Sequence, residues 1–281
     1  MSGDFLARMA AASHARVRAA RAQLDESALA ESCRQLPAPP VLRRDPRGFD
    51  LIAELKLRSP AAGRLAAADA DVPRQVTAYA RAGAAAVSVL TEPERFDGSL
   101  AHLAAAARAL APLAVPALRK DFLVDPYQVL EARAAGAGGV LVILRMLARE
   151  ELAALLACAH AQGLFVLLEA FDEPDIALMH EVVVTHAAPA TLLAGVNCRD
   201  LASLEVRPQR LLELAPLLPA QLAHVAESGV ASARDAQAVA AAGYQFALVG
   251  SALMRAADPF ALASSLLAAG RAVRGKACDV D

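Results

Sequence analysis

The sequence lacks a long apolar run, although 57% of its 281 residues are hydrophobic. Charged residues interrupt each apolar segment before it reaches about 18 residues, roughly the shortest length of a membrane-spanning helix. The formal net charge is only −2, and there is no basic stripe of the kind that binds nucleic acid. The composition therefore argues against a membrane partner and a nucleic-acid partner, and it favours a large buried core.

Cysteine is scarce, and the first residues lack the apolar segment of a secretory signal. The four cysteines are scattered, without the paired spacing of a metal site or of a disulfide framework: Cys33, Cys158, Cys198 and Cys278. A reducing compartment suits them, so we expect a cytoplasmic protein. Apolar residues recur near helical spacing between Phe5 and Leu24 and predict an amphipathic helix, with an organellar transit peptide as the alternative.

Lysine is scarcer than the charge content suggests. Of the 28 lysines and arginines, only Lys56, Lys120 and Lys276 are lysines. Lys56 and Lys120 each stand at the end of an apolar run. Because an ammonium group can lose its proton under local tuning and a guanidinium effectively cannot, these two are the first candidates for proton chemistry. The alternative is that they are ordinary surface charges.

Eight short apolar runs follow residue 50, with amphipathic segments between them. The runs lack regular alternation with polar residues, which is typical of buried parallel strands. They begin near Leu51, Ala86, Val115, Val140, Phe165, Leu192, His224 and Phe246. Eight strand–helix units in roughly 230 residues match a closed (β/α)8 TIM barrel. A doubly wound open sheet is the alternative, but the turn after the first run lacks the G-x-G-x-x-G pattern common in such sheets.

Residues at the ends of the intervening segments favour helices. Asp125 and Pro126 suit an N-cap and a first helical position, and Ser232 with Asp235 resembles a capping box. Glycines that tolerate the left-handed conformation stand where helices should end: Gly83, Gly136, Gly163 and Gly243.

No linker separates the units, so we expect a single domain over residues 1–281. Residues 49–281 form the barrel in this interpretation. Residues 1–48 form an N-terminal helical extension, broken by prolines near its end, which packs on the barrel or covers one mouth.

Polar residues stand at the predicted C-terminal ends of the strands, where barrels carry their working residues. Glu54 and Lys56 share one face of the first strand, because strand side chains alternate. Lys120 ends the third strand within Arg119-Lys120-Asp121, and Glu169 ends the fifth. Such groups shift each other's pKa values toward neutrality in catalytic sites. A structural ion-pair network is the alternative.

Basic residues near these ends predict a mouth with an excess of positive charge, suited to an anionic substrate: Lys56, Arg58, Arg119, Lys120 and Arg199. Gly229 and the pair Gly250-Ser251 follow the seventh and eighth strands, where barrels commonly bind phosphate through backbone N–H groups. The two loops together predict a phosphorylated small-molecule substrate.

Six ordered segments resemble those of indole-3-glycerol phosphate synthases. They are LIAELKLRSPAAGRL (51–65), SVLTEPERFDGSL (88–100), LRKDFLVDPYQVLEARAAGA (118–137), GVNCRDL (195–201), VAESGV (225–230) and ALVGSALMRAADP (247–259). The resemblance covers nearly the whole chain. It implies a TIM-barrel lyase of tryptophan biosynthesis that needs no cofactor.

This family closes the pyrrole ring of 1-(2-carboxyphenylamino)-1-deoxyribulose 5-phosphate, with release of carbon dioxide and water. The resemblance implies that Lys120 is the general acid and Glu169 the general base. It implies that Lys56 contacts the carboxylate of the anthranilate part and that Glu54 helps to position charge.

The resemblance also implies roles in orientation and binding. Asn197 and Arg199 orient catalytic groups or substrate, and Ser228 contacts the substrate. Phe96 lies against the aromatic part of the substrate, with ordinary packing as an equal alternative. The phosphate-binding positions are Ser59, Gly229, Gly250 and Ser251.

Two positions depart from the family pattern. Ala61 replaces a serine of the first motif, and Cys198 stands where asparagine or serine is frequent. No histidine accompanies Cys198 as a base, so we do not expect a cysteine nucleophile. No histidine falls in a strand-end motif either, so we expect no metal site.

Two rival functions stay open. Another ribulose-phosphate-binding barrel, such as phosphoribosylanthranilate isomerase, would be expected to use a cysteine–aspartate pair at the mouth. A barrel that binds a phosphorylated ligand without turnover would not need Glu54, Lys56, Lys120, Glu169 and Asn197 together. The family resemblance further suggests a loose association with other enzymes of the tryptophan pathway.

Overall fold

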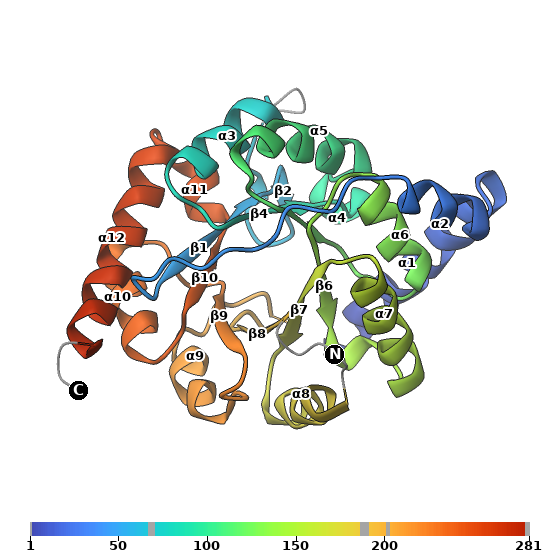
Figure 1. Ribbon diagram of the computed structural model, residues 1–281. Helices are drawn as coiled ribbons and strands as arrows, with labels where there is room; N and C mark the ends of the chain where they lie inside the picture. The colour runs from blue at the N-terminus through green and yellow to red at the C-terminus, as the bar shows by residue number, and fades with distance from the viewer. Residues whose placement is uncertain (1, 67–70, 186–190, 201–202, 279–281) are drawn as a thin grey trace.

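The computed structural model describes residues 2–66, 71–185, 191–200 and 203–278. Eight parallel strands close into a barrel in the order β1-β10-β9-β8-β7-β6-β5-β4 (Figure 1). They are β1 (Asp50–Leu55), β4 (Ala86–Leu90), β5 (Ala117–Lys120), β6 (Gly139–Ile143), β7 (Phe165–Ala170), β8 (Leu192–Asn197), β9 (Ala223–Glu227) and β10 (Phe246–Val249). Each predicted strand start lies within two residues of the observed one, and the predicted closed barrel is confirmed.

Helices surround the strands on the outside of the barrel (Figure 1). The longer ones are α3 (Val72–Arg81), α5 (Leu100–Leu110), α6 (Pro126–Ala134), α7 (Arg149–Ala161), α8 (Glu173–Thr185), α9 (Gln209–Leu214), α10 (Ala233–Ala241) and α12 (Pro259–Cys278). Shorter elements follow some strands: a hairpin of β2 (Arg58–Ser59) and β3 (Gly63–Arg64), then α4 (Pro93–Phe96) and α11 (Ser251–Arg255). No helix among the described residues is long and apolar enough to cross a membrane.

The predicted helix ends are confirmed. The Asp125 carboxylate accepts a hydrogen bond from the backbone N–H of Tyr127 at the start of α6. Ser232 and Asp235 make both halves of a capping box on α10. All four predicted C-terminal glycines have positive φ, for example 99° at Gly83 and 106° at Gly243.

Strand alternation divides the core into two layers. On β1, Leu51, Ala53 and Leu55 face outward and pack under the helices. Ile52 faces inward and joins a second apolar cluster that fills the inside of the barrel. Glu54 has the same inward direction one step further along, so the barrel interior changes from apolar to polar toward the C-terminal ends of its strands.

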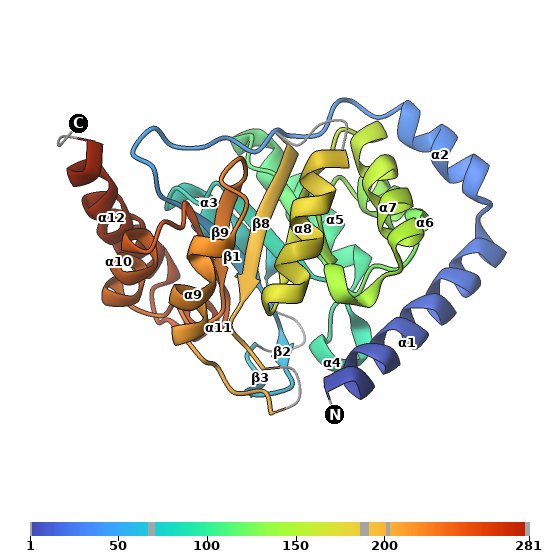
Figure 2. The same ribbon diagram turned by 90° about the horizontal axis from the view of Figure 1, so that it is seen from below.

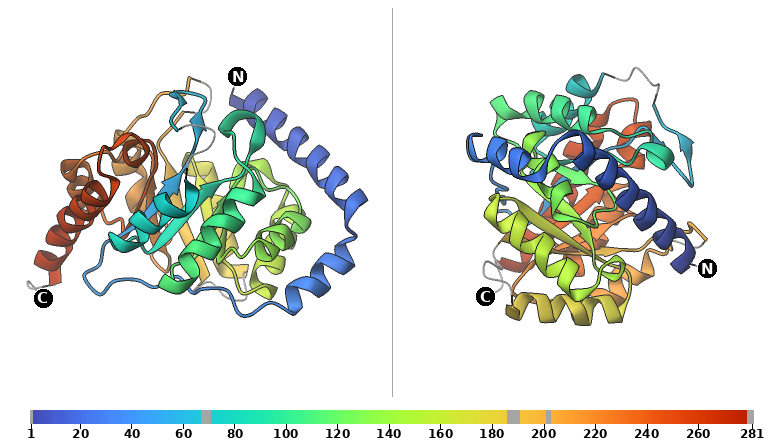
Figure 3. Two further views of the ribbon diagram at one scale, coloured as in Figure 1. Left: turned by 90° about the horizontal axis from the view of Figure 1, so that it is seen from above. Right: turned by 90° about the vertical axis from the view of Figure 1, so that its right-hand side faces the viewer.

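The N-terminal extension consists of α1 (Ser2–Gln23) and α2 (Glu26–Arg34). The N-terminus of α1 lies at the same end of the barrel as the β2–β3 hairpin and α4, and the helix then runs along the outside toward α2 (Figures 2 and 3). Leu6 and Met9 of α1 join the inner apolar cluster at this mouth. Leu29 and Cys33 of α2 pack against the side of the barrel over α6. The extension therefore both borders one mouth and packs on the barrel.

Gly270 of α12 lies against Phe49, the residue before β1. A Cβ at Gly270 would stand 2.1 Å from Phe49 Cδ1, inside the barrel–helix contact. Alanine normally stabilises a helix relative to glycine by about 1 kcal/mol, but forcing a methyl group into a packed core typically costs about 1–3 kcal/mol. We expect Gly270→Ala to lower the free energy of unfolding by about 1–2 kcal/mol, as measured by urea denaturation.

Phe49→Leu supplies the control for this expectation. If the Phe49 ring is the obstacle, the two substitutions together should cost less than the sum of their separate effects. A Gly270→Ala variant as stable as the wild type, or more stable, would mean that the contact is loose.

Candidate active site

A cavity of about 310 Å³ opens at the C-terminal ends of the strands. All twelve residues singled out in the sequence for catalysis or binding line it. They are Glu54, Lys56, Ser59, Phe96, Lys120, Glu169, Asn197, Arg199, Ser228, Gly229, Gly250 and Ser251. The parallel strands of the closed barrel bring these residues to one place, although the chain separates the first and last of them by almost 200 residues.

Lys120 lies between two glutamates at the centre of the cavity. Its Nζ is 3.3 Å from Glu169 Oε2 and 3.1 Å from Glu227 Oε2. The side chains are 16%, 3% and 1% exposed, respectively. An unpaired charge at such a depth costs several kcal/mol, so the ammonium and the carboxylates depend on each other for their charged forms.

Lys56 and Glu54 form a second pair, with Lys56 Nζ donating to Glu54 Oε1 at 2.5 Å. Glycines stand beside Glu54 and Glu227: Gly250 directly after β10, and Gly195 on β8. A Cβ at Gly250 would lie 2.0 Å from Glu54 Oε1, and a Cβ at Gly195 would lie 2.4 Å from Glu227 Oε1. The glycine in the Gly250-Ser251 pair therefore accommodates Glu54 as well as bordering the predicted phosphate site.

Asn197 links the acidic side of the cavity to the loop after β9. Its Nδ2 donates to Glu169 Oε1 at 2.6 Å, and its Oδ1 accepts from Ser228 Oγ and from the Arg199 backbone N–H, each at 2.9 Å. Ser228 has φ of 67° and Gly229 has φ of 74°. Two successive residues in the left-handed region, one of them not glycine, form a strained turn of the kind that concentrates at functional sites.

The two buried partners of the central ion pair have pKa values shifted upward. Burial alone would lower the pKa of Lys120, but the carboxylates of Glu169, Glu227 and Glu54 outweigh burial and raise it above its ordinary value. Burial, followed by repulsion from Glu169, raises the pKa of Glu227 to about 8 despite the attraction of Lys120. The expected shift toward neutrality is therefore wrong for Lys120, and the residue that moves toward neutrality is Glu227.

Glu227 is the residue of this site to which the sequence analysis gave no role. One of its oxygens contacts Lys120, and the other, Oε1, is buried without a hydrogen-bond partner. Alternation along β9 could have found it, because Val225 belongs to the inner cluster and Glu227 follows it on the same face. The sequence analysis assigned only the next two residues, Ser228 to substrate contact and Gly229 to phosphate binding.

The predicted excess of positive charge at the mouth is wrong. Arg119 points out of the barrel, where its guanidinium donates to the Gln128 carbonyl at 2.6 Å and pairs with Glu131. Arg58 pairs with Asp97 at 3.5 Å and does not line the cavity. Three basic and four acidic residues line the cavity: Lys56, Lys120, Arg199, Glu54, Asp121, Glu169 and Glu227.

Apolar side chains form one wall of the cavity. The Phe122 ring lies 5.9 Å from that of Phe5, edge to face, and 6.3 Å from that of Phe96. Leu141 and Ile143 of β6 continue this wall. Phe96 lines the cavity, as expected from the sequence. Its ring also packs against Phe122, so the alternative of ordinary packing holds as well. Such a wall is suited to a flat apolar group.

Cys198 does not line the cavity. It is buried directly after β8, in the apolar cluster between the strands and the helices and close to Gly229, and burial raises its pKa to about 11. A thiol in this state is a poor nucleophile, in agreement with the expectation from the sequence. Ala61, the other departure from the family pattern, lies in the cavity lining. Among the described residues, no group of three or more histidine, cysteine, aspartate or glutamate residues could hold a metal ion.

Comparison with known proteins identifies close relatives. The family model described as indole-3-glycerol phosphate synthase matches residues 6–266. The indole-3-glycerol phosphate synthase of Micrococcus luteus is 41% identical over 264 residues, which cover 90% of this chain and 93% of that protein. The enzymes of that name from Parafrankia sp. and Mycobacterium avium are 41% and 42% identical over 247 and 240 residues. These cover 87% and 83% of this chain, and 88% and 83% of theirs.

Solved structures share the architecture at low sequence identity. 3-Hexulose-6-phosphate synthase from Salmonella typhimurium has a TM-score of 0.61 at 14% identity, and the match covers 80% of this chain and 100% of that chain. Orotidine 5′-phosphate decarboxylase from Pyrococcus horikoshii has a TM-score of 0.57 at 14% identity, covering 79% and 99%. These similarities support the barrel fold alone.

The raised pKa of Glu227 has a consequence for stability. In the unfolded chain this carboxyl titrates near 4.5, and in the folded protein near 8. Between these values the folded state binds more protons, so the contribution of Glu227 to stability is fully present below about 4.5 and is lost as the pH rises to about 8. We expect the wild type to lose more stability between pH 5 and pH 8 than Glu227→Gln, which has no proton to release.

Urea denaturation of both proteins at several pH values measures this difference. Glu150→Gln, at an exposed position of α7 that does not line the cavity, serves as a charge-matched control and should follow the wild type. Parallel pH profiles for the wild type and Glu227→Gln would contradict the assignment.

Proposed function

The chain belongs to the indole-3-glycerol phosphate synthase family, and on that premise we propose that its cavity closes the pyrrole ring of 1-(2-carboxyphenylamino)-1-deoxyribulose 5-phosphate. The reaction releases carbon dioxide and water, which makes the protein a carboxy-lyase. The observation that carries the proposal is the position of Lys120, held between two glutamates and lying in the same cavity as an apolar wall and two glycine-containing loops.

The two ends of the substrate fit different parts of the cavity. The benzene ring suits the wall of Phe5, Phe96 and Phe122, and its carboxylate suits the ammonium of Lys56. The phosphate suits the loop positions that provide hydroxyl and backbone N–H donors: Ser59, Gly229, Gly250 and Ser251. Because the basic residues of the cavity do not outnumber the acidic ones, these local donors, rather than an excess of positive charge, would recognise the anion.

In the first step, the ring carbon that bears the carboxylate attacks the ketone carbon. A carbon–carbon bond forms, and the carbonyl electron pair moves to oxygen. Lys120 is proposed to donate the proton that this oxygen takes up. The raised pKa keeps Lys120 protonated before the reaction, and an alkoxide is a stronger base than a lysine amine, so the transfer is downhill once the oxyanion develops.

Two steps complete the ring. The carboxylate leaves as carbon dioxide, and its bonding electrons restore the aromaticity of the benzene ring. The hydroxyl group then takes up a proton, which Lys56 is proposed to donate, and leaves as water, while a base removes a proton from the new ring. Glu169 is proposed as this base, oriented by the amide of Asn197 at 2.6 Å. Lys56 and Glu54 stand near enough to each other to exchange a proton during dehydration.

Glu227 is proposed to position Lys120. With a pKa of about 8, it is mostly protonated near pH 7, so it contributes a hydrogen-bond partner without a full second negative charge beside Glu169. Two ionised carboxylates on one ammonium would hold the proton more tightly. A largely neutral Glu227 therefore leaves Lys120 a stronger acid than two carboxylates would.

The rival functions receive less support. The isomerase alternative calls for a cysteine at the barrel mouth, whereas Cys198 lies outside the cavity and its pKa is raised to about 11. A barrel that only bound its ligand would bury several ionisable groups without using them, at a cost in stability. Both arguments favour the cyclisation.

We also propose that the extension and the barrel act as one domain in the cytoplasm. Phe5 of the extension lines the same cavity as the barrel residues, which supports a common unit. Three of the cysteines, Cys33, Cys158 and Cys198, are free thiols and suit a reducing compartment. A loose association with other enzymes of the pathway is part of the same proposal.

The direct test is to add the carboxyphenylamino-deoxyribulose phosphate and follow indole fluorescence. The chain has no tryptophan, so the product signal rises from a low background. We expect Lys120→Arg, which keeps the charge but cannot readily release a proton, to lower kcat by at least about 100-fold. Near-normal turnover by this variant would contradict the role of Lys120 as the acid, and no product from the wild type would contradict the function.

Glu169→Gln separates catalysis from binding. The glutamine keeps the size of the side chain and can still hydrogen-bond, but it cannot accept a proton as a base. We expect kcat to fall by about 100-fold or more, with product affinity within about threefold of the wild type. Equilibrium titration with indole-3-glycerol phosphate, alongside the turnover assay, measures both. Lost affinity with preserved turnover would assign Glu169 to binding instead.

A further inference from the structure

Ser13 of α1 is a fully buried polar residue that lies among the buried apolar side chains Leu6, Met9 and Val17 of the same helix. Its hydroxyl donates to the backbone carbonyl of Phe122 at 2.5 Å and accepts from Gln128 Nε2 at 2.8 Å. Gln128 in turn accepts from the backbone N–H of Val124 at 2.8 Å. Ser13 and Gln128 therefore clamp the backbone on both sides of Leu123, in the loop after β5.

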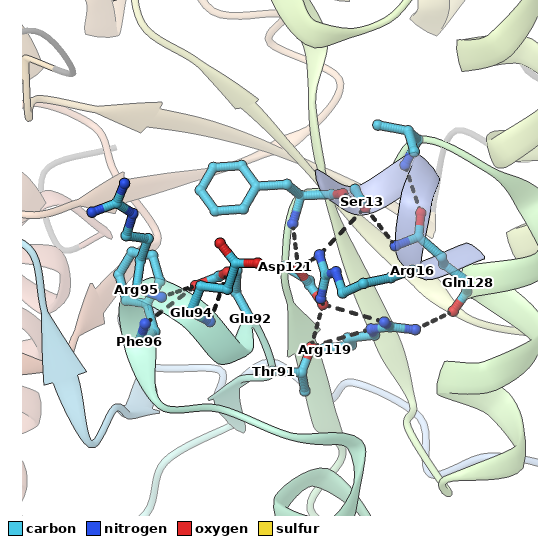
Figure 4. A network of polar contacts seen from close by, with 12 residues as sticks. Ser13, Arg16, Thr91, Glu92, Glu94, Arg95, Phe96, Arg119, Asp121 and Gln128 are labelled. Carbon is cyan, nitrogen blue, oxygen red and sulfur yellow. Dashed lines mark hydrogen bonds and ion pairs between the residues drawn. The ribbon is translucent and has the colours of Figure 1, made fainter. Parts of the chain in front are cut away.

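Arg16, one turn further along α1, holds the start of the same loop. Its guanidinium donates twice to the Asp121 carboxylate, at 2.8 and 3.0 Å. Asp121 also accepts from Thr91 Oγ1 and from the Phe122 backbone N–H, each at 2.8 Å. Figure 4 shows Ser13, Arg16, Thr91, Asp121 and Gln128 in one polar network with Arg119.

A neighbouring part of this network holds α4. Glu92, which is buried, accepts hydrogen bonds from the backbone N–H groups of Glu94, Arg95 and Phe96 (Figure 4). Thr91, the preceding residue, bonds to Asp121. The backbones that carry Phe96 and Phe122 are thus joined through the Thr91–Asp121 hydrogen bond. The helix that carries Phe5, α1, contributes Ser13 and Arg16 to the same network.

We propose that Ser13 and Arg16 are positioning residues for the aromatic end of the cavity, because they hold the 121–124 segment so that the Phe122 ring stays packed between Phe5 and Phe96. The inference rests on the proposed function, since it assigns the three-phenylalanine wall to the benzene ring of the substrate. Neither residue lines the cavity, so both act through Phe122. The N-terminal helix is in this way part of the recognition of the aromatic group.

The burial of the hydroxyl supports this interpretation over simple packing. A buried polar group without a partner typically costs about 1–3 kcal/mol, and an apolar residue at position 13 would leave both the Phe122 carbonyl and the Gln128 amide in need of one. The Phe122 carbonyl lies on the loop that carries the wall, and Gln128, in α6, holds the same loop through the backbone N–H of Val124. Displacement of that loop would alter the fit of an aromatic ring more than that of a phosphate, which suits the loops after β9 and β10.

Ser13→Ala tests the proposal with two ligands of this cavity. Indole-3-glycerol phosphate carries both an aromatic ring and a phosphate, whereas glycerol 3-phosphate carries only the phosphate end. We expect the variant to bind the indole compound about five- to tenfold more weakly, with glycerol 3-phosphate affinity within about twofold of the wild type. KM for the substrate should rise by a similar factor, and kcat should change much less.

A double-mutant cycle with Phe122→Ala shows whether Ser13 acts through that ring. Phe122→Ala alone should weaken binding of the indole compound, and adding Ser13→Ala should weaken it no further. Arg16→Ala should change the ratio of the two affinities in the same direction as Ser13→Ala. Arg18→Ala, which removes an exposed arginine from the same helix, serves as the matched control and should bind both ligands as the wild type does.

Three results would overturn the inference: unchanged affinities in Ser13→Ala, equal losses for both ligands, or additive effects with Phe122→Ala. Equal losses would indicate a general effect on the fold, which thermal denaturation of the same variants would reveal. A wild-type protein that turns over substrate while Ser13→Ala binds normally would overturn this inference alone. A wild type that neither turns over substrate nor binds the indole compound would overturn the proposed function first.

Discussion

The pairing of buried charges around Lys120 is the constraint on which the mouth of this barrel depends. The ammonium can stay charged at that depth because Glu169 and Glu227 both accept hydrogen bonds from it, and Lys120 in return limits how far burial raises the pKa of Glu227. Removal of one member leaves the others uncompensated. The inner apolar cluster below the pair fills the remaining interior, so the polar groups are confined to one end. The groups that stabilise the buried ammonium are therefore the same groups that are proposed to take part in catalysis.

Sequence periodicity was sufficient to predict the barrel, because each strand is a short apolar run and each helix has a recognisable end. It was also sufficient to gather the cavity residues, since the C-terminal ends of parallel strands meet at one mouth. Arg119 was misplaced because closeness to a strand end does not fix the direction of a side chain, which depends on strand alternation. It follows an inward-facing Leu118 and precedes Lys120, and so points outward.

Other features depend on contacts between distant segments and left no local signal. The upward shift of the Glu227 pKa arises from depth and from Glu169, which lies on another strand. The contacts of Ser13 reach more than 100 residues along the chain to Phe122 and Gln128. Serine in a helix is usually read as a solvent-facing or capping residue, and only the packing of α1 against the loop after β5 gives this one a different meaning.

The glycines opposite the two glutamates limit how this mouth can be remodelled. A methyl group at Gly250 or Gly195 would meet a carboxylate oxygen of Glu54 or Glu227, so the acid would have to move. Each glycine and the long acid that faces it across the strands behave as one steric unit. Attempts to redesign the cavity for a bulkier or differently charged compound would have to shorten the acid and fill the glycine together. Accessible redesigns are thus paired substitutions, and single-site libraries at these positions should yield few folded, active proteins.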